Sequence, residues 1–148
     1  MGLDTTHDAF HGAYSAFNTF RQAIAHAIGG SYGPHYLRAY GGELARDERG
    51  YPIPDRSLDD SLFYFPNTLT KEGNPGLWEF FHHSDCDGEI SPQACVHVAD
   101  EMEAILPKIT DDIRAGHIAA RGGMIEVTKK FIAGCRAAAA AGEPLGFH

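Results

Sequence analysis

The sequence predicts a small α+β domain that is mostly helical, with about three main helices. Three stretches repeat apolar residues at steps of three and four, the spacing that places them on one face of a helix. They cover residues 13–28, 92–106 and 123–141. The chain has 148 residues, of which 43% are hydrophobic and 22% charged. These values are typical of one domain with its own core, so we expect a single domain over residues 1–148.

Signals at the helix ends support this assignment. Ser91 and Pro92 are a typical N-cap and first residue for the second helix, and Gly142 follows the third, where glycine readily forms the terminating turn. A single amphipathic helix is not stable alone, so the three apolar stripes should pack together. Each helix is then expected to bury one large side chain, namely Phe17, Met102 and Phe131.

The segment 31–76 lacks a helical period and is rich in Gly, Pro, Asp and Tyr. We expect short strands or turns there, with strands at 36–40 and 61–65, because a structureless loop of this length is uncommon in a compact domain. A short helix over 75–82 should follow, since Pro75 suits a first helical turn. The residues expected on its apolar face are Leu77, Trp78 and Phe81.

The formal net charge of −8 makes nucleic acid and anionic membranes poor partners, because both are polyanions. No apolar run approaches the ~20 residues that a membrane span needs. The first residues lack the charged and apolar parts of a signal peptide. We therefore expect a soluble, cytoplasmic protein that binds neither nucleic acid nor membrane. The alanine run 137–141 has little side-chain bulk, which allows close approach of a second copy in a homo-oligomer.

The loop from His83 to Ser91, with the sequence HSDCDGEIS, is patterned like most of an EF-hand calcium loop. Such a loop has twelve positions, with oxygen ligands at 1, 3, 5, 7, 9 and 12 and glycine at 6. With position 1 at His83, the glycine falls on Gly88, and the branched apolar residue Ile90 falls on position 8. The candidate metal ligands are then His83, Asp85, Asp87, Glu89 and Ser91.

Two residues depart from the EF-hand pattern. His83 stands where aspartate is usual, and Ala94 stands where the bidentate glutamate belongs. Calcium is the first expected ion, with weak affinity, because it takes six to eight oxygen ligands. Zn²⁺ or Mn²⁺ is second, since imidazole and carboxylate ligands suit these metals. The same residue types also build a metal-free turn, in which aspartates accept backbone N–H bonds. No organic cofactor is expected.

A second candidate set lies near the N-terminus and consists of His7, Asp8 and His11. If this stretch is helical, the two histidines share one face, as in the two-histidine zinc motif. A metal shared with His83 and the loop aspartates would make a metal-dependent hydrolase. The metal would lower the pKa of a bound water, and Asp8 would act as base. The plainer alternative is that these histidines are surface side chains or cap the backbone.

The three cysteines, Cys86, Cys95 and Cys135, are expected to be free thiols, because three cannot all pair and no secretory signal is present. Cys95 and Cys135 stand at apolar helical positions, where they should pack as small hydrophobic residues. Cys86 beside His82 or His83 allows a thiolate–imidazole nucleophile, although adjacency does not establish its geometry. The sequence identifies no catalytic residues, which are left as unknown.

Four stretches together resemble a family of small bacterial and phage proteins with no assigned activity. They are GLDTTH at 2–7, HGAYSAF at 11–17, HSDCDG at 83–88 and GEPLGF at 142–147. The resemblance implies that the N-terminal histidine segment and the central loop belong to one unit. It implies no catalytic residues.

The sequence thus favours a divalent-metal-binding domain with a structural or regulatory role and no assigned reaction. The metal-dependent hydrolase is the alternative. A third interpretation is a metal-free module that binds a partner through the aromatic residues of the middle segment.

Overall fold

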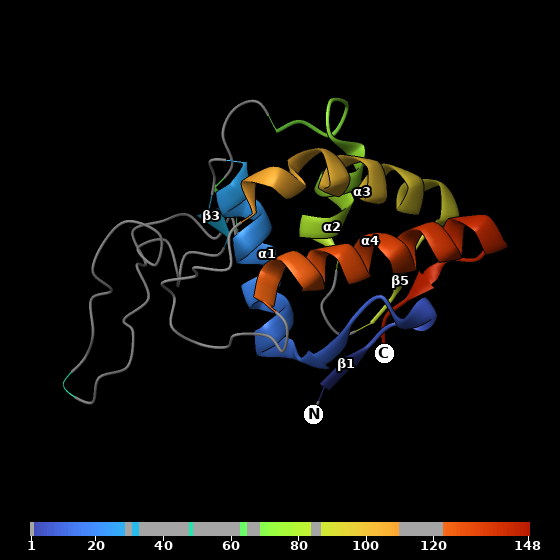
Figure 1. Cartoon of the computed structure of the whole chain (residues 1–148), viewed down its shortest axis with the longest axis horizontal. Coiled ribbons are helices and arrows are strands. Elements are labelled where there is room, and N and C mark those ends of the chain that lie inside the picture. The colour runs from blue at the N-terminus through green and yellow to red at the C-terminus, as the bar shows by residue number, and fades with distance from the viewer. Residues whose placement is uncertain are drawn as a thin grey trace.

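The computed structural model describes residues 2–28, 31–32, 48, 63–64, 69–83, 87–109 and 123–148. Helices dominate this part of the chain, with very short strands between them (Figure 1). The α-helices are α1 (Tyr14–Ala27), α2 (Pro75–His82), α3 (Pro92–Ile105) and α4 (Gly123–Ala141). The described residues also include the 3₁₀ turns η1 (Thr6–Asp8) and η3 (Leu106–Lys108). The predicted mostly helical α+β fold is confirmed.

The helix ends follow the local signals in the chain. Ser91 caps α3, because its hydroxyl accepts a hydrogen bond from the Ala94 amide at 3.1 Å, and Pro92 occupies the first turn. Helix α4 has the predicted bounds, and Gly142 after it has a φ of +66°. The predicted second helix ends one residue earlier than expected and continues as η3.

Helix α2 is fixed to α3 at its N-terminus by the carboxylate of Glu101. This carboxylate accepts hydrogen bonds from the amides of Gly76 at 2.7 Å and Leu77 at 3.2 Å. A negative charge at these free amides also interacts favourably with the helix dipole. The two helices approach so closely that a β-carbon on Gly76 would overlap the backbone of His97 and Val98.

In the described part of the chain, the short strands pair antiparallel in three ribbons. The strands are β1 (Gly2–Asp4), β2 (His11–Ala13), β3 (Ser31–Tyr32), β4 (Phe63–Tyr64), β5 (Glu89–Ile90) and β6 (Leu145–Gly146). The pairs are β1 with β2, β3 with β4, and β5 with β6. Strand β4 lies inside the predicted strand 61–65, whereas the predicted strand 36–40 lies outside the described residues.

Further backbone hydrogen bonds connect two of these ribbons through the segment 145–148. Asp4 and His148 exchange amide–carbonyl bonds of 2.7 and 2.9 Å, and Thr5 forms a bridge with Phe147. On the other side, the Phe147 amide donates to the Gly88 carbonyl at 2.9 Å. The order in space is therefore β2, β1, segment 145–148 and β5, so the N-terminal segment and the central loop flank the same strand.

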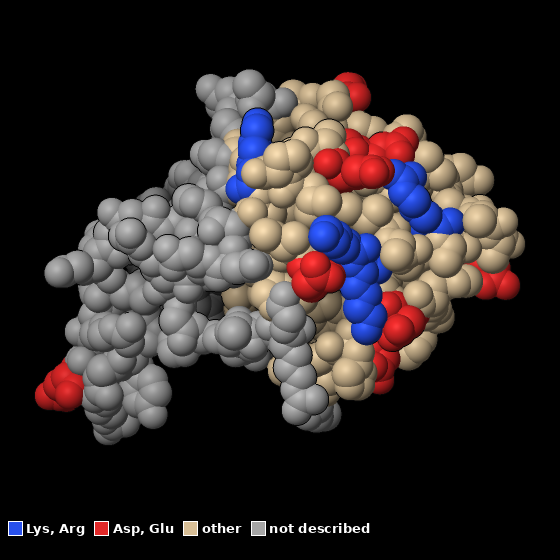
Figure 2. Space-filling view, viewed as in Figure 1, with Lys and Arg blue, Asp and Glu red and all other residues tan. Residues whose placement is uncertain are grey.

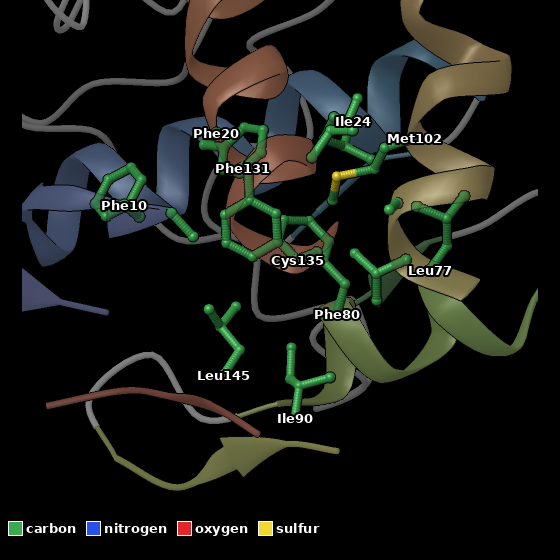
Figure 3. Close-up of a cluster of buried hydrophobic side chains, with 14 of the residues drawn as sticks. Phe10, Phe20, Ile24, Leu77, Phe80, Ile90, Met102, Phe131, Cys135 and Leu145 are labelled. Carbon is green, nitrogen blue, oxygen red and sulfur yellow. The ribbon is translucent and has the colours of Figure 1, made fainter. Parts of the chain in front are cut away.

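The core centres on a cluster of fully buried phenylalanines from three helices. Phe20 of α1, Phe80 of α2 and Phe131 of α4 lie together (Figure 3), with ring centroids 5.3–5.4 Å apart. Phe17 of α1 packs against all three. Met102 of α3 is also fully buried. Each such side chain contributes about 1.5–3 kcal/mol through removal from water. The predicted burial of Phe17, Met102 and Phe131 is confirmed.

The face of α2 differs in part from the prediction. Leu77 and Phe81 are buried as expected, and Phe80 is buried as well. Trp78 is only half-buried and stacks on the exposed His82, with 4.3 Å between ring centroids. Phe80 therefore takes the place on the buried face of α2 that was predicted for Trp78.

Charged side chains of both signs lie next to each other over α3 and α4 (Figure 2). Arg136 of α4 donates to Asp100 at 3.1 Å and to Glu103, both on α3. Such exposed pairs contribute little stability each, about 0–1 kcal/mol. Within the described residues, no helix has the length and apolar character needed to cross a membrane.

Candidate functional site

The loop 83–91 lies between two helices, as an EF-hand pattern requires. Helix α2 ends at His82, and the His83 amide closes its last turn by donating to the Glu79 carbonyl at 2.9 Å. Helix α3 begins at Pro92, which is position 10 of the twelve-position pattern. Ser91, at position 9 of the pattern, is thus the N-cap of α3.

Gly88 takes the backbone conformation that the pattern assigns to position 6. Its φ of +91° favours glycine, because a β-carbon is strained there. A β-carbon on Gly88 would also lie only 3.3 Å from His83 Nε2, so the imidazole at position 1 faces position 6. The His83 ring is half-buried and packs on Phe147, with 4.3 Å between centroids. Positions 1 and 6 of the pattern therefore lie close together.

Strand β5 orients positions 7 and 8 of the loop. Ile90 is fully buried and pairs with the buried Leu145 (Figure 3). The bond from the Phe147 amide to the Gly88 carbonyl makes the facing pair of Glu89 and Gly146 a non-hydrogen-bonded pair. The Glu89 carbonyl therefore points away from β6 and is available to the loop, as required of a position-7 ligand.

The side-chain oxygens of the loop have different environments. Asp87 and Glu89 are exposed. The Ser91 hydroxyl is exposed and caps α3 while it retains a second lone pair. Ala94 has no side-chain oxygen to complete a calcium shell. Asp85 lies outside the described residues.

The described side chains alone do not assemble a metal centre. In the part of the chain that the structure describes, no three His, Cys, Asp or Glu side chains come together in a way that could hold a metal ion. Besides the side chains of His83 and Asp87, the EF-hand pattern takes ligands from the Glu89 backbone carbonyl, the Ser91 hydroxyl and the Asp85 carboxylate. A complete metal shell would therefore depend on these three groups.

The N-terminal stretch is not the α-helix that the two-histidine motif needs. His7 and Asp8 belong to η1 and have positive φ values of 55° and 54°, whereas His11 stands in β2. Two successive left-handed residues cannot continue a helical repeat, so the i, i+4 arrangement of His7 and His11 is wrong.

The side chains of His7, Asp8 and His11 have three different partners. These are, in that order, Glu143 at 3.0 Å, Lys130 at 3.3 Å and Asp4. Within the described residues they form no metal-holding group with His83 or Asp87. The hydrolase constellation therefore gains no support from their placement.

Arg21 is a residue of the site that sequence reasoning missed. It lies on α1, is 3% exposed, and donates a hydrogen bond from Nη2 to the His83 carbonyl. The signal was its position, four residues after Phe17 and three before Ile24, in the middle of an apolar stripe. An arginine there must be either turned out of the core or paired inside it.

The two described thiols are buried away from solvent, where they cannot readily meet a reaction partner. Cys95 and Cys135 are free and fully buried, as expected. Cys95 donates weakly to the Ile90 carbonyl at 3.7 Å. The hydrogen bond with Cys95, together with burial, raises the pKa of the Cys135 thiol. Cys86, and with it the thiolate–imidazole interpretation, lies outside the described residues.

Comparison with known proteins adds no relative to this description. No protein-family model, no curated protein and no solved structure matches the chain.

Proposed function

We propose that this protein binds one divalent cation, calcium first, through the loop 83–91, in a structural or regulatory role with no assigned reaction. The observation that carries the proposal is the conformation of the loop between α2 and α3. Gly88 has the positive φ of position 6, Ile90 is buried at position 8, and α3 starts at position 10. Three independent features of the EF-hand pattern thus occur in register.

The proposed ligands are mostly oxygens. Asp85 and Asp87 would supply carboxylates, Glu89 its backbone carbonyl, and Ser91 its hydroxyl through a water. His83 at position 1 is suited to Zn²⁺ or Mn²⁺, which are the second choice of ion. Since the bidentate glutamate is absent, we expect a calcium Kd at the weak end of the range for such loops, about 10⁻⁴–10⁻³ M.

A cation in this loop would join elements that are distant in the sequence. The loop connects α2 to α3 directly, and its strand β5 pairs with β6. Binding to the folded state would therefore stabilise the contacts among all of them. We further infer from the sequence a cytoplasmic protein without a nucleic-acid partner. The exposed residues Ala137, Ala140 and Ala141 support a homo-oligomer through α4.

Calorimetric titration of chelator-treated protein tests this function. We expect saturable binding of one calcium ion per chain, with magnesium much weaker because it demands a smaller octahedral shell. Titration with Zn²⁺ and Mn²⁺ then ranks the second choice. Absence of binding for calcium, zinc and manganese at millimolar concentrations would refute the proposed function.

A further inference from the structure

Segment 143–148 packs between strand β1 and the central loop. It follows α4, and its side chains Leu145 and Phe147 are buried in the core. The Phe147 ring reaches both α1 and the loop, because its centroid lies 5.7 Å from that of Phe17 and 4.3 Å from that of His83. The segment thus helps to hold the first residue of the loop in place.

Backbone hydrogen bonds tie this segment to elements on both sides. On one side, Asp4 of β1 and His148 exchange amide–carbonyl bonds of 2.7 and 2.9 Å. On the other side, the Phe147 amide donates to the Gly88 carbonyl at 2.9 Å. Because these bonds lie outside the α-helices, they can break without the loss of a helical hydrogen bond.

The turn η1 fastens the start of the segment. The Thr6 hydroxyl accepts a hydrogen bond from the Gly146 amide at 2.8 Å and donates more weakly to the Pro144 carbonyl at 3.5 Å. His7 pairs with Glu143 at 3.0 Å, but the Glu143 side chain is 64% exposed, so this pair contributes little. The hydroxyl is the stronger fastening, because its loss would leave a part-buried amide without this acceptor.

We propose that segment 143–148 is a strap that opens as one unit while the α-helices stay folded, with the Thr6 hydroxyl as its fastening. Proteins open locally in cooperative units of this kind, at a lower free energy than global unfolding. Opening of the strap releases the His83 ring and the Gly88 carbonyl together. The turn η1 therefore controls how firmly these two loop residues are held, whether or not the loop binds a cation.

Hydrogen exchange of the backbone amides, followed by NMR on the full chain, tests whether the strap is a unit. The amides of Asp4, Phe147 and His148 should share one opening constant, and urea below the unfolding transition should barely change it. Amides in the middle of α4 should be better protected and depend steeply on urea, because they exchange through unfolding that exposes far more surface. If the three amides depend on urea as steeply as α4 does, they open only by global unfolding, which overturns the proposal.

Two variants of the full chain then test the fastening. Thr6→Val weakens the native state against every open state, so the protection of the three amides and of α4 should fall by the same factor, about fivefold or more. Ile24→Val is the control: Ile24 is fully buried and lies on the other side of the core cluster from Leu145 (Figure 3). It removes packing that persists when the strap opens.

In Ile24→Val, the α4 amides should therefore lose about 2–13-fold of their protection, whereas the Asp4, Phe147 and His148 amides keep theirs. Equal losses at both places in this variant would show that the strap does not open on its own. Unchanged protection of the three amides in Thr6→Val would show that the hydroxyl is not the fastening. If Thr6→Val does not fold, the urea dependence of the parent still decides whether the strap is a unit.

Discussion

Replacing Asp85 and Asp87 together by asparagine should remove the stabilisation of this protein by calcium. Asparagine keeps the size and one acceptor oxygen of each side chain, so the turn can persist, but the two charges that attract the cation are lost. In the parent, calcium at a hundredfold excess over Kd should stabilise the folded state by about 2.7 kcal/mol. For a chain of this length, that is a rise of roughly 5–10 °C in Tm. The double variant should show no rise in thermal melts.

The matched control for this experiment is Asp8→Asn with Glu126→Gln. Both residues are exposed and form ion pairs with lysines, and the control has the same change of net charge. Its Tm should rise with calcium as in the parent. A rise that survives in the loop variant but disappears in the control would move the site to the N-terminal segment and contradict the assignment to the loop.

Replacing Gly134 by alanine should destabilise the fold by about 1–2 kcal/mol, the cost of overpacking less the gain in helix propensity. Helix propensity alone predicts the opposite, a gain of about 1 kcal/mol. The added β-carbon, however, would lie 2.5 Å from Ala9 Cα and closer still to Ala9 Cβ. The turn that carries Ala9 cannot easily withdraw, because the Phe10 amide donates to Thr5 Oγ1 at 2.8 Å. Overpacking of this kind typically costs 1–3 kcal/mol. Urea unfolding measures the change.

Gly12→Ala is the control for this substitution. The nearest atoms to a β-carbon on Gly12 lie 3.5 Å away in Phe10, an ordinary van der Waals distance. Its free energy of unfolding should therefore change by less than about 1 kcal/mol. If Gly134→Ala is as stable as the parent, the close contact between α4 and the N-terminal turn is not as described.

The helices were predictable from sequence because local chemistry specifies them. The apolar stripe and Gly142 are sufficient to define α4, and the serine–proline pair defines the start of α3. The strands β1, β2 and β6 were not expected. With two or three residues each, they have no detectable period. Strand β6 forms because it pairs with β5, which is distant in the chain, whereas β1 and β2 pair across the short turn that contains η1.

The candidate site was predictable only in part. The pattern HSDCDGEIS identified Gly88 and Ile90, whose roles depend on local conformation. The helical pairing of His7 and His11 failed, since the spacing of two histidines does not determine the backbone between them. Arg21 was missed because its partner, His83, is 62 residues away. The apolar stripe marks the arginine as unusual, but it does not identify a partner so distant in the chain.

The most direct test of the central claim is an NMR titration of chelator-treated protein with calcium, followed through the backbone amides. Binding in the loop should shift the signals of Gly88, Glu89 and Ile90 most strongly and saturate with a single Kd. Amides near Ala133 on the exposed side of α4 should stay unchanged. If the loop signals do not move at millimolar calcium, or if the largest shifts centre on His7 and Glu143, the loop is not the cation site.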